Sequence, residues 1–462
     1  MINEATRQYI GRHKDDDVRT LALRGCKDEG VNLQLALQQI QGRQTARRKL
    51  PSWADNDAIV YPPHLSMEQC SSECTARYKA RLASRMKACQ LRAKVLPPPL
   101  CTAVLPPPLC AAVLPPLATP IATSQLIDLS GGLGVDFAFM AEAFGEAVYV
   151  ERDEQLCAIA AHNFQALGLH HVTTVCAEAE GFLARNAGED LPPALARRPF
   201  IYIDPARRNA NGEAAIVKGT LESRKFVALA DCTPNVVAMM PALLRIAACV
   251  MLKLSPMLDW RKAVADLAPH HVSEVHTVAV DNECKELLIL LNPPTVGSGS
   301  AAAAHGNRPR LVCTDIHSRT GTYTIYTPRN GASSPSCSVE QAAPGAYLYE
   351  PNAAIMKAGC FNELAADFAV CQLSANSHLY CTPRLIDDFP GRRFLIQATC
   401  SMNKRELRTT IGHLKQANIA VRNFPLTADQ LRQRLRLADG GTYYIFATTL
   451  ADGSHTLLLC SK

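Results

Sequence analysis

The chain lacks any long apolar run. No segment offers the roughly 18 uninterrupted apolar residues that a membrane-spanning helix requires, and residues 1–20 are polar and charged, without the apolar core of a secretory signal. Hydrophobic residues make up 48% of the 462-residue chain and charged residues only 19%, a balance typical of globular domains. We therefore expect a soluble, cytoplasmic protein without a membrane segment.

Metal-binding cysteine patterns are also scarce, although the chain has 18 cysteines. The closest pair, Cys70 and Cys74, has C-x3-C spacing and no second pair at metal-binding spacing. Most other cysteines stand in apolar segments of a long chain without an export signal, which indicates reduced core residues. We expect no metal site.

The length favours two or three domains, and composition marks their limits. A proline-rich nine-residue repeat fills residues 93–119, and a Gly, Ser and Ala-rich stretch fills 293–309. Consecutive prolines exclude a helix, so the repeat is most simply a semi-rigid linker, with a docking motif as the alternative. The predicted divisions are a helical N-terminal domain (1–92), a linker (93–120), a central domain (121–292), a linker with irregular structure (293–339) and two C-terminal parts (340–390 and 391–462).

Basic residues concentrate near the N-terminus. Residues 1–95 contain 17 Lys and Arg against 10 Asp and Glu, whereas the whole chain has a net charge of +6. These side chains suit either contacts with a phosphate backbone or a solvated helix face, and the sequence leaves both open. They include Arg43, Arg47, Arg48, Lys49, Arg77, Lys79, Arg81, Arg85 and Lys87.

The central domain alternates short apolar runs with helical stretches, which predicts a parallel sheet covered by helices. Its last two strand candidates, 272–280 and 284–291, follow each other closely and predict an antiparallel hairpin at the sheet edge. Helical spacing is also expected over 21–37, 71–92 and 431–437, and strands over 443–448 and 456–460.

A glycine turn follows the first strand of this domain, in the segment LIDLSGGLGVD from Leu126 to Asp136. Such a turn lets the main chain approach a nucleotide-like ligand at the carboxyl edge of a sheet. Acids follow the next two strands: Glu151 is placed to bind ribose hydroxyls, and Glu178 stands at the height of an adenine amino group. Each acid taken alone also suits an ordinary surface position.

A fourth strand ends in Asp204-Pro205, and proline restricts the main chain on both sides of itself. We expect Asp204 to orient a substrate, because the alignment of reacting groups can supply much of an enzyme's rate enhancement. Arg207 is a candidate substrate contact or a surface arginine. Lys253 and Ser255, at the end of the fifth strand, are further substrate candidates, with an Asp204–Lys253 structural ion pair as the alternative.

These motifs resemble the class I S-adenosylmethionine-dependent methyltransferases whose fourth motif is [D/N]-P-P-[F/Y/W], several of which methylate exocyclic amines of nucleic acid bases. The resemblance is greatest to a bacterial group of RNA-methyltransferase-like proteins with a THUMP-like C-terminal domain. It spans most of the chain, through the segments 71–83 (SSECTARYKARLA), 128–136, 204–207, 253–259 (KLSPMLD), 282–288 (NECKELL), 347–359, 388–394 and 419–426.

The resemblance implies a Rossmann-like α/β sheet, with an N-terminal helical domain and a C-terminal α+β region that is ferredoxin-like and then THUMP-like. It implies S-adenosylmethionine bound by Asp128, Ser130, Gly131, Gly132, Gly134 and Glu151, with Asp204 and Pro205 placing the target. Ala206 and Arg207 replace the second proline and the aromatic residue of the motif, which weakens the case for an exocyclic amine.

The implied partner is a structured RNA, tRNA or rRNA. Phosphate contacts are expected from the basic residues Arg392, Arg393, Lys404, Arg405, Arg408 and Arg422. A methyltransferase for protein or a small molecule, and a non-catalytic RNA-binding protein with a vestigial cofactor fold, are the alternatives. The sequence does not give the oligomeric state.

Overall fold

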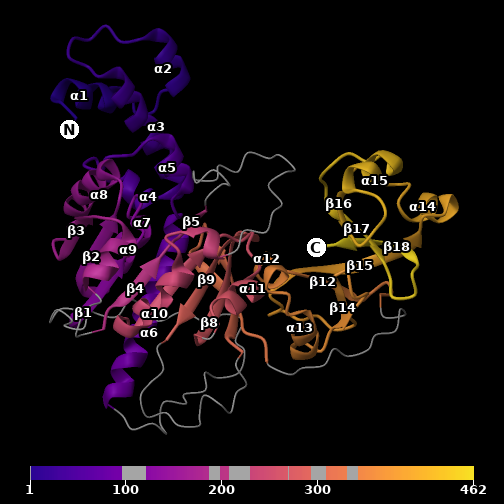
Figure 1. Cartoon of the computed structure of the whole chain (residues 1–462). Helices are drawn as coiled ribbons and strands as arrows, with labels where there is room; N and C mark the ends of the chain where they lie inside the picture. The colour runs from indigo at the N-terminus through magenta and orange to yellow at the C-terminus, as the bar shows by residue number, and fades with distance from the viewer. Residues whose placement is uncertain are drawn as a thin grey trace. The chain divides into compact units, whose positions relative to one another are not determined.

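The computed structural model describes residues 2–95, 121–186, 198–207, 229–268, 270–292, 308–329 and 342–462. These form two compact units (Figure 1). The first contains the described residues up to Val275 together with 286–292 and 308–310, and the second contains 276–285 and 311–462. The proline-rich repeat lies outside the described residues.

Short helices begin the first unit: α1 (Glu4–His13), α2 (Val18–Arg24), α3 (Leu33–Lys49), α4 (Pro51–Ala54), α5 (His64–Gln69) and the long α6 (Glu73–Val95). Asn3, Asp17 and Asn32 cap α1, α2 and α3 with side-chain oxygens, as expected of N-cap residues. The predicted helical stretch 21–37 is interrupted, because α2 ends at Gly25, whose φ of 69° does not continue a helix.

A twisted sheet forms the core of the first unit, with the strand order β8-β9-β7-β4-β1-β2-β3. The strands are β1 (Ile121–Asp128), β2 (Phe144–Glu151), β3 (Val172–Cys176), β4 (Phe200–Ile203), β7 (Cys249–Leu254), β8 (Val272–Val280) and β9 (Glu283–Leu291). β1 pairs in parallel with β2 and β4 on its two sides, whereas β9 runs antiparallel to β7. All four residues of β4 are buried, which explains its uninterrupted apolar sequence.

Helices connect these strands: α7 (Val135–Ala141), α8 (Glu154–Ala166), α9 (Ala179–Asn186), α10 (Val236–Ile246) and α11 (Trp260–Asp266). The short strands β5 (Ala206–Arg207) and β6 (Cys232–Thr233) pair antiparallel beyond the end of β4, and the 3-10 helix η4 (Leu229–Asp231) precedes β6. The strand order reverses at β1, because β2 and β3 lie on one side of it and β4 lies on the other. The carboxyl ends of β1, β2 and β4 therefore border the crevice where such folds bind ligands.

Two predictions for the following segment need correction. The hairpin of β8 and β9 is not at the sheet edge, because the strand order continues from β8 to β10 (Arg310–His317) and β11 (Thr322–Tyr326). These two strands lie in the segment 293–339 that was expected to be irregular. Their buried residues Val312, Cys313, Ile316 and Tyr326 supply the apolar pattern that the composition of this segment obscured.

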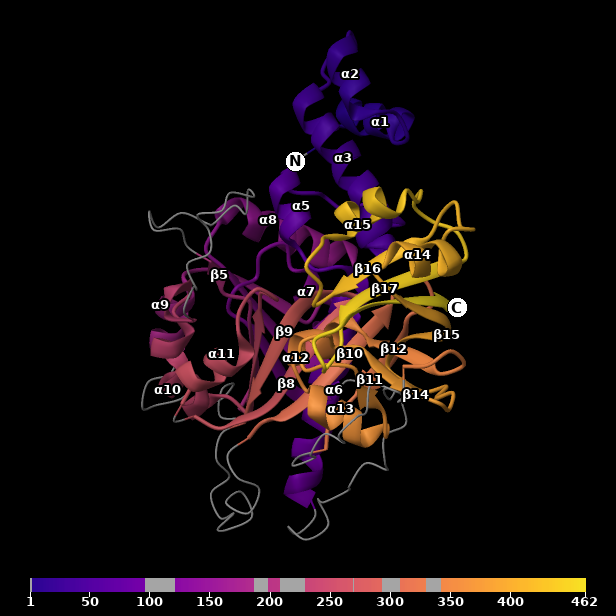
Figure 2. The same ribbon diagram turned by 90° about the vertical axis from the view of Figure 1, so that its right-hand side faces the viewer.

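The second unit contains a seven-stranded sheet with the order β13-β14-β12-β15-β18-β17-β16 (Figure 2). Its strands are β12 (Tyr347–Pro351), β13 (Cys371–Gln372), β14 (Tyr380–Thr382), β15 (Gly391–Ser401), β16 (Asn418–Arg422), β17 (Tyr443–Thr449) and β18 (His455–Ser461). The long strand β15 pairs with β12 through its first half and with β18 through the rest, so it joins the two C-terminal parts into one sheet.

Helices α12 (Ala353–Ala358), α13 (Phe361–Asp367), α14 (Lys404–Thr410) and α15 (Ala428–Leu435) complete this unit. Leu407 of α14 and Leu431 of α15 pack in one apolar cluster with Ile445, Leu457 and Leu459. The two helices therefore cover the same face of β17 and β18, and their opposite sides face outward (Figures 1 and 2).

The cysteines of the described segments largely follow the prediction, since Cys157 and Cys249 are buried and free. Two cysteines are exceptions to this pattern of reduced, buried residues: Cys176 is free but exposed, and Cys371 is disulfide-bonded.

None of the helices in the described part of the chain is both long and apolar enough to cross a membrane. Within the same residues, no cluster of three or more His, Cys, Asp or Glu side chains could hold a metal ion.

Candidate active site

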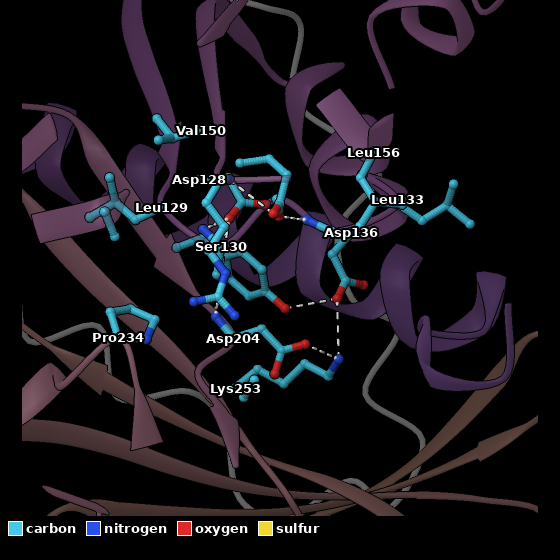
Figure 3. Close-up of a pocket in the computed structure, with 18 of the residues that line it drawn as sticks. Asp128, Leu129, Ser130, Leu133, Asp136, Val150, Leu156, Asp204, Pro234 and Lys253 are labelled. Atoms are coloured by element: carbon cyan, nitrogen blue, oxygen red, sulfur yellow. Dashed lines mark hydrogen bonds and ion pairs between the residues drawn. The ribbon is translucent and has the colours of Figure 1, made fainter. Parts of the chain in front are cut away.

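A cavity of about 320 Å³ opens at the carboxyl ends of β1, β2 and β4 in the first unit (Figure 3). The glycine turn after β1 forms one wall, and the residues that follow β2 and β3 form another. Asp204 and Lys253 close the side beyond β4 and β7. Residues of α5 and of its junction with α6 also contribute: Ser66, Gln69, Cys70 and Ser71. The cavity thus gathers residues from distant parts of the sequence.

The glycine turn has no space for side chains at two of its positions. A Cβ at Gly131 would lie 2.2 Å from the ring of Tyr149, and a Cβ at Gly134 would lie 2.7 Å from the ring of Phe164. Gly132 differs, because its φ of +56° favours glycine although its surroundings are open. The Tyr149 hydroxyl donates a hydrogen bond to the Gly132 carbonyl, which fixes the turn on the sheet.

Asp128 ends β1 and is buried, with its Oδ1 atom accepting hydrogen bonds from the main-chain N–H (2.9 Å) and hydroxyl (3.3 Å) of Ser130. Burial raises the pKa of Asp128 well above its usual range. Burial therefore disfavours the charged carboxylate, and a ligand that donates hydrogen bonds to Asp128 would stabilise this charged form.

Glu151 lies where the sequence predicts the ribose-binding acid. Its Oε2 accepts a 2.7 Å hydrogen bond from the main-chain N–H of Gly132, and its Oε1 accepts from the N–H groups of Arg152 and Asp153 at 2.9 Å. A carboxylate has about four acceptor positions. Three are occupied here, so about one remains, on Oε2, for a ligand hydroxyl group. Glu178 also lines the cavity, with 61% of its side chain exposed and Arg152 at 3.9 Å.

Asp204 is joined to both neighbouring strands. Its main-chain N–H donates to the Ser130 hydroxyl at 2.6 Å, and its Oδ2 accepts from Lys253 Nζ, also at 2.6 Å (Figure 3). Although burial opposes it, the carboxylates of Asp204 and Asp136 raise the pKa of Lys253. Lys253 thus remains an ammonium. The structure shows the Asp204–Lys253 ion pair that the sequence analysis gave as an alternative to substrate contact.

Asp136, in the first turn of α7, connects this pair to a buried polar network. Its Oδ2 accepts hydrogen bonds of 2.7 Å from the Ser71 hydroxyl and the Tyr202 hydroxyl and lies 3.6 Å from Lys253 Nζ. Its Oδ1 lies 3.2 Å from Lys79 Nζ. Burial favours the neutral acid, but the two lysines lower the pKa of Asp136, so this carboxylate is charged.

The sequence missed Asp136, Lys79 and Tyr202 as parts of this site. Two of them had a signal: Asp136 directly follows the glycine turn, and Lys79 belongs to the segment 71–83 that carries part of the family resemblance. Tyr202 had none, since a tyrosine within an apolar strand ordinarily packs in the core.

Two other predicted residues, Pro205 and Ser255, do not line the cavity. Pro205 is buried, and the Ser255 hydroxyl accepts from the N–H of Met257 at 3.3 Å within its own turn. The main chain of Arg207 pairs with Cys232, and its side chain lies outside what the structure describes.

Most of the N-terminal basic residues have partners within the protein, although Arg47 and Arg77 also stay exposed to solvent. Lys79 is fully buried, and Lys49 donates to the main-chain carbonyls of Met67 and Glu68. Four arginines form ion pairs: Arg43 with Asp57, Arg47 with Asp15, Arg77 with Glu73, and Arg85 with Glu274.

Comparisons with known proteins agree with this geometry. Family models for a ferredoxin-like domain and a THUMP-like domain match residues 347–390 and 391–462. Proteins from two strains of Mycobacterium tuberculosis, each named an uncharacterized S-adenosylmethionine-dependent methyltransferase, are 25% identical over 352 residues, covering 73% of this chain and 83% of theirs. The crystal structure of a "putative methyltransferase" from Porphyromonas gingivalis W83 matches with a TM-score of 0.73 and 25% identity over 100% of both chains.

The lining of the cavity also fits S-adenosylmethionine chemically. A Cβ at Gly132 would have no heavy atom nearer than the Ser130 carbonyl oxygen at 3.9 Å, so the main chain of the turn is open to a ligand there. The acidic lining suits a ligand that carries a sulfonium and an ammonium group. The fold and the full-length structural match therefore give this chain a class I S-adenosylmethionine-dependent methyltransferase fold, followed by ferredoxin-like and THUMP-like C-terminal domains.

Proposed function

We propose that this methyltransferase modifies a base in structured RNA, tRNA or rRNA, and that Asp204 orients the acceptor atom. The observation that carries the RNA assignment is the THUMP-like match over residues 391–462, together with the basic outer side of α14. The identity of the methylated atom is left to the experiment.

The arrangement around Asp204 supports its proposed role. Bound S-adenosylmethionine supplies a methyl group on a sulfonium, which an aligned acceptor lone pair attacks. The Asp204 side chain is 39% exposed, and Lys253 occupies its Oδ2. Oδ1 is then the oxygen that would accept a hydrogen bond from the acceptor group and align its lone pair with the methyl group.

Helix α14 presents three cations to solvent. Lys404, Arg405 and Arg408 are exposed, and none forms an ion pair with another residue in the described segments. Free cations on one helix suit phosphate groups, because each contact releases counterions from the nucleic acid.

The other three arginines proposed for phosphate contact have internal partners. Arg392 and Arg422 both donate to the buried carboxylate of Glu350, and Arg393 donates to Asp387. Arg392 and Arg422 therefore tie β15 and β16 to β12. We accordingly narrow the proposed RNA contacts to α14.

The experiment is a transfer assay with methyl-labelled S-adenosylmethionine. The enzyme is incubated separately with total RNA, a protein extract and a small-molecule extract, and Asp204→Ala serves as the matched control. We expect label in RNA that ribonuclease releases and that the variant fails to incorporate. Label confined to protein or to small molecules would favour those substrates. Cofactor binding without transfer to any fraction would favour the non-catalytic alternative.

A further inference from the structure

Lys79 of α6 is a buried charge with two acidic partners. Its side chain has no exposed surface, and its Nζ lies 2.7 and 2.8 Å from the two carboxylate oxygens of Glu286 in β9. The same atom lies 3.2 Å from Asp136 Oδ1. Lys79 does not line the cavity, so it cannot touch a ligand there.

Asp136 stands between this lysine and a second one. Lys79 faces Oδ1, whereas Oδ2 accepts hydrogen bonds from Ser71 and Tyr202. Lys253 Nζ is 3.6 Å from that Oδ2 but only 2.6 Å from Asp204 Oδ2. Lys253 therefore has two carboxylates within reach and binds Asp204 more closely (Figure 3).

The preference of Lys253 for Asp204 has a physical explanation. A buried carboxylate requires a cation or several hydrogen bonds. Asp136 obtains these from Lys79, Ser71 and Tyr202, so it does not need Lys253. Without Lys79, the nearest remaining cation would be Lys253, and the attraction between the two would draw the ammonium away from Asp204.

We propose that Lys79 is a positioning residue for Asp204: by neutralising Asp136, it leaves Lys253 free to hold the Asp204 carboxylate at the acceptor end of the cavity. This inference rests on the role proposed above for Asp204. It gives the segment 71–83 a place in the site, since both Ser71 and Lys79 reach Asp136 from the helical part of the chain.

The test removes Lys79 without leaving its partner stranded. Removing one member of a buried ion pair strongly destabilises a protein, so Lys79→Met is combined with Glu286→Gln. This pair variant loses one positive and one negative charge and keeps Asp136. The matched triple variant adds Asp136→Asn, which preserves the shape of the side chain and its hydrogen bonds but removes the charge that would attract Lys253.

The kinetic readout compares the rates at which these variants and the wild type methylate the substrate RNA. In the pair variant we expect kcat to fall by about tenfold or more, because displacement of a positioning group by about 1 Å has large effects on rate. The dissociation constant of S-adenosylmethionine, from calorimetry, should change less than about threefold. In the triple variant kcat should recover most of this loss. A further loss in the triple variant would overturn the proposal, since a purely structural defect accumulates with each substitution.

The second readout does not depend on a substrate. Crystal structures of the two variants should show Lys253 Nζ within hydrogen-bond distance of Asp136 in the pair variant and back on Asp204 in the triple variant. If Lys253 stays on Asp204 in the pair variant, the inference is wrong whatever the substrate. If the wild type methylates no RNA while Lys253 moves as expected, the proposed substrate fails and the positioning role of Lys79 stands.

Discussion

The main-chain N–H of Asp204 donates a 2.6 Å hydrogen bond to the hydroxyl of Ser130, and that hydroxyl also donates to Asp128 at 3.3 Å. A single side chain in the glycine turn therefore links the carboxyl end of β1 to the residue proposed to orient the acceptor.

Replacing Ser130 should separate catalysis from cofactor binding. We expect Ser130→Ala to lower kcat by about three- to tenfold, the effect of losing a hydrogen bond of about 1 kcal/mol. Cofactor affinity should fall less, because the Ser130 main-chain N–H still binds Asp128. Ser130→Thr retains the hydroxyl and is the control. Equal rates for wild type and Ser130→Ala in single-turnover assays would show that this link has no catalytic role.

Substitutions in the glycine turn should have different consequences at adjacent positions. Gly132→Asp places a second carboxylate beside Glu151, whose Oε2 is 2.7 Å from the Gly132 nitrogen, and should abolish cofactor binding. Gly132→Ala meets open space and should bind more weakly but measurably. Gly131→Ala meets the Tyr149 ring and should lower the melting temperature instead. Titration calorimetry that finds wild-type affinity in Gly132→Asp would remove this residue from the site.

The contribution of Asp128 to the stability of the fold should depend on pH. Its raised pKa means that the native carboxyl group keeps a proton after the unfolded chain has lost it near 3.8. The stability from this group is therefore complete below that pH and is lost as pH rises toward the native pKa. In Asp128→Asn this loss is absent, so the melting temperature of the variant minus that of the wild type should increase with pH.

The same variant should bind S-adenosylmethionine at least about tenfold more weakly, through loss of a hydrogen bond to a charged group. Asp136→Asn is the control, because the contribution of Asp136 to stability should change with pH in the opposite direction. The pKa of Asp136 is lowered by the nearby lysines against the effect of burial, so its contribution is present above the unfolded pKa of 3.8 and is lost as pH falls. Asp136→Asn should be less stable than the wild type at neutral pH. Parallel pH–stability curves for both variants and the wild type would contradict these assignments.

Much of the central fold could be predicted because its signals are local. Strand 272–280 has the predicted bounds, and the strand predicted over 284–291 begins one residue earlier, at Glu283. The glycine turn was equally readable, since its glycines stand directly after the first strand of the domain.

The network behind Asp204 could not be predicted in the same way. Lys79 and Glu286 are 207 residues apart, and nothing in either neighbourhood indicates a partner of opposite charge. A lysine in a polar helical segment suggests a surface position, yet this one is buried. The strands β10 and β11 were missed because a Gly, Ser and Ala-rich stretch precedes them. The composition of that stretch led to a prediction of irregular structure for the whole segment 293–339.

The cations of α14 should determine the salt dependence of RNA binding. Replacing Lys404, Arg405 and Arg408 with Gln should lower the slope of log affinity against log salt by roughly two to three, as expected for loss of three phosphate contacts. Arg422→Gln should instead reduce thermal stability, since Arg422 pairs with buried Glu350, and should leave the slope unchanged. Filter-binding titrations across salt concentrations measure both slopes. An unchanged slope in the triple variant would exclude α14 from the RNA interface.

The most direct test of RNA methylation by this chain is mass spectrometry of nucleosides from total RNA of cells with and without the protein. One methylated nucleoside should disappear when the protein is absent and return when the wild type is restored. Asp204→Ala should bind S-adenosylmethionine with nearly unchanged affinity yet restore less than about a tenth of the modification rate. Identical nucleoside profiles with and without the protein, or full restoration by Asp204→Ala, would contradict the account.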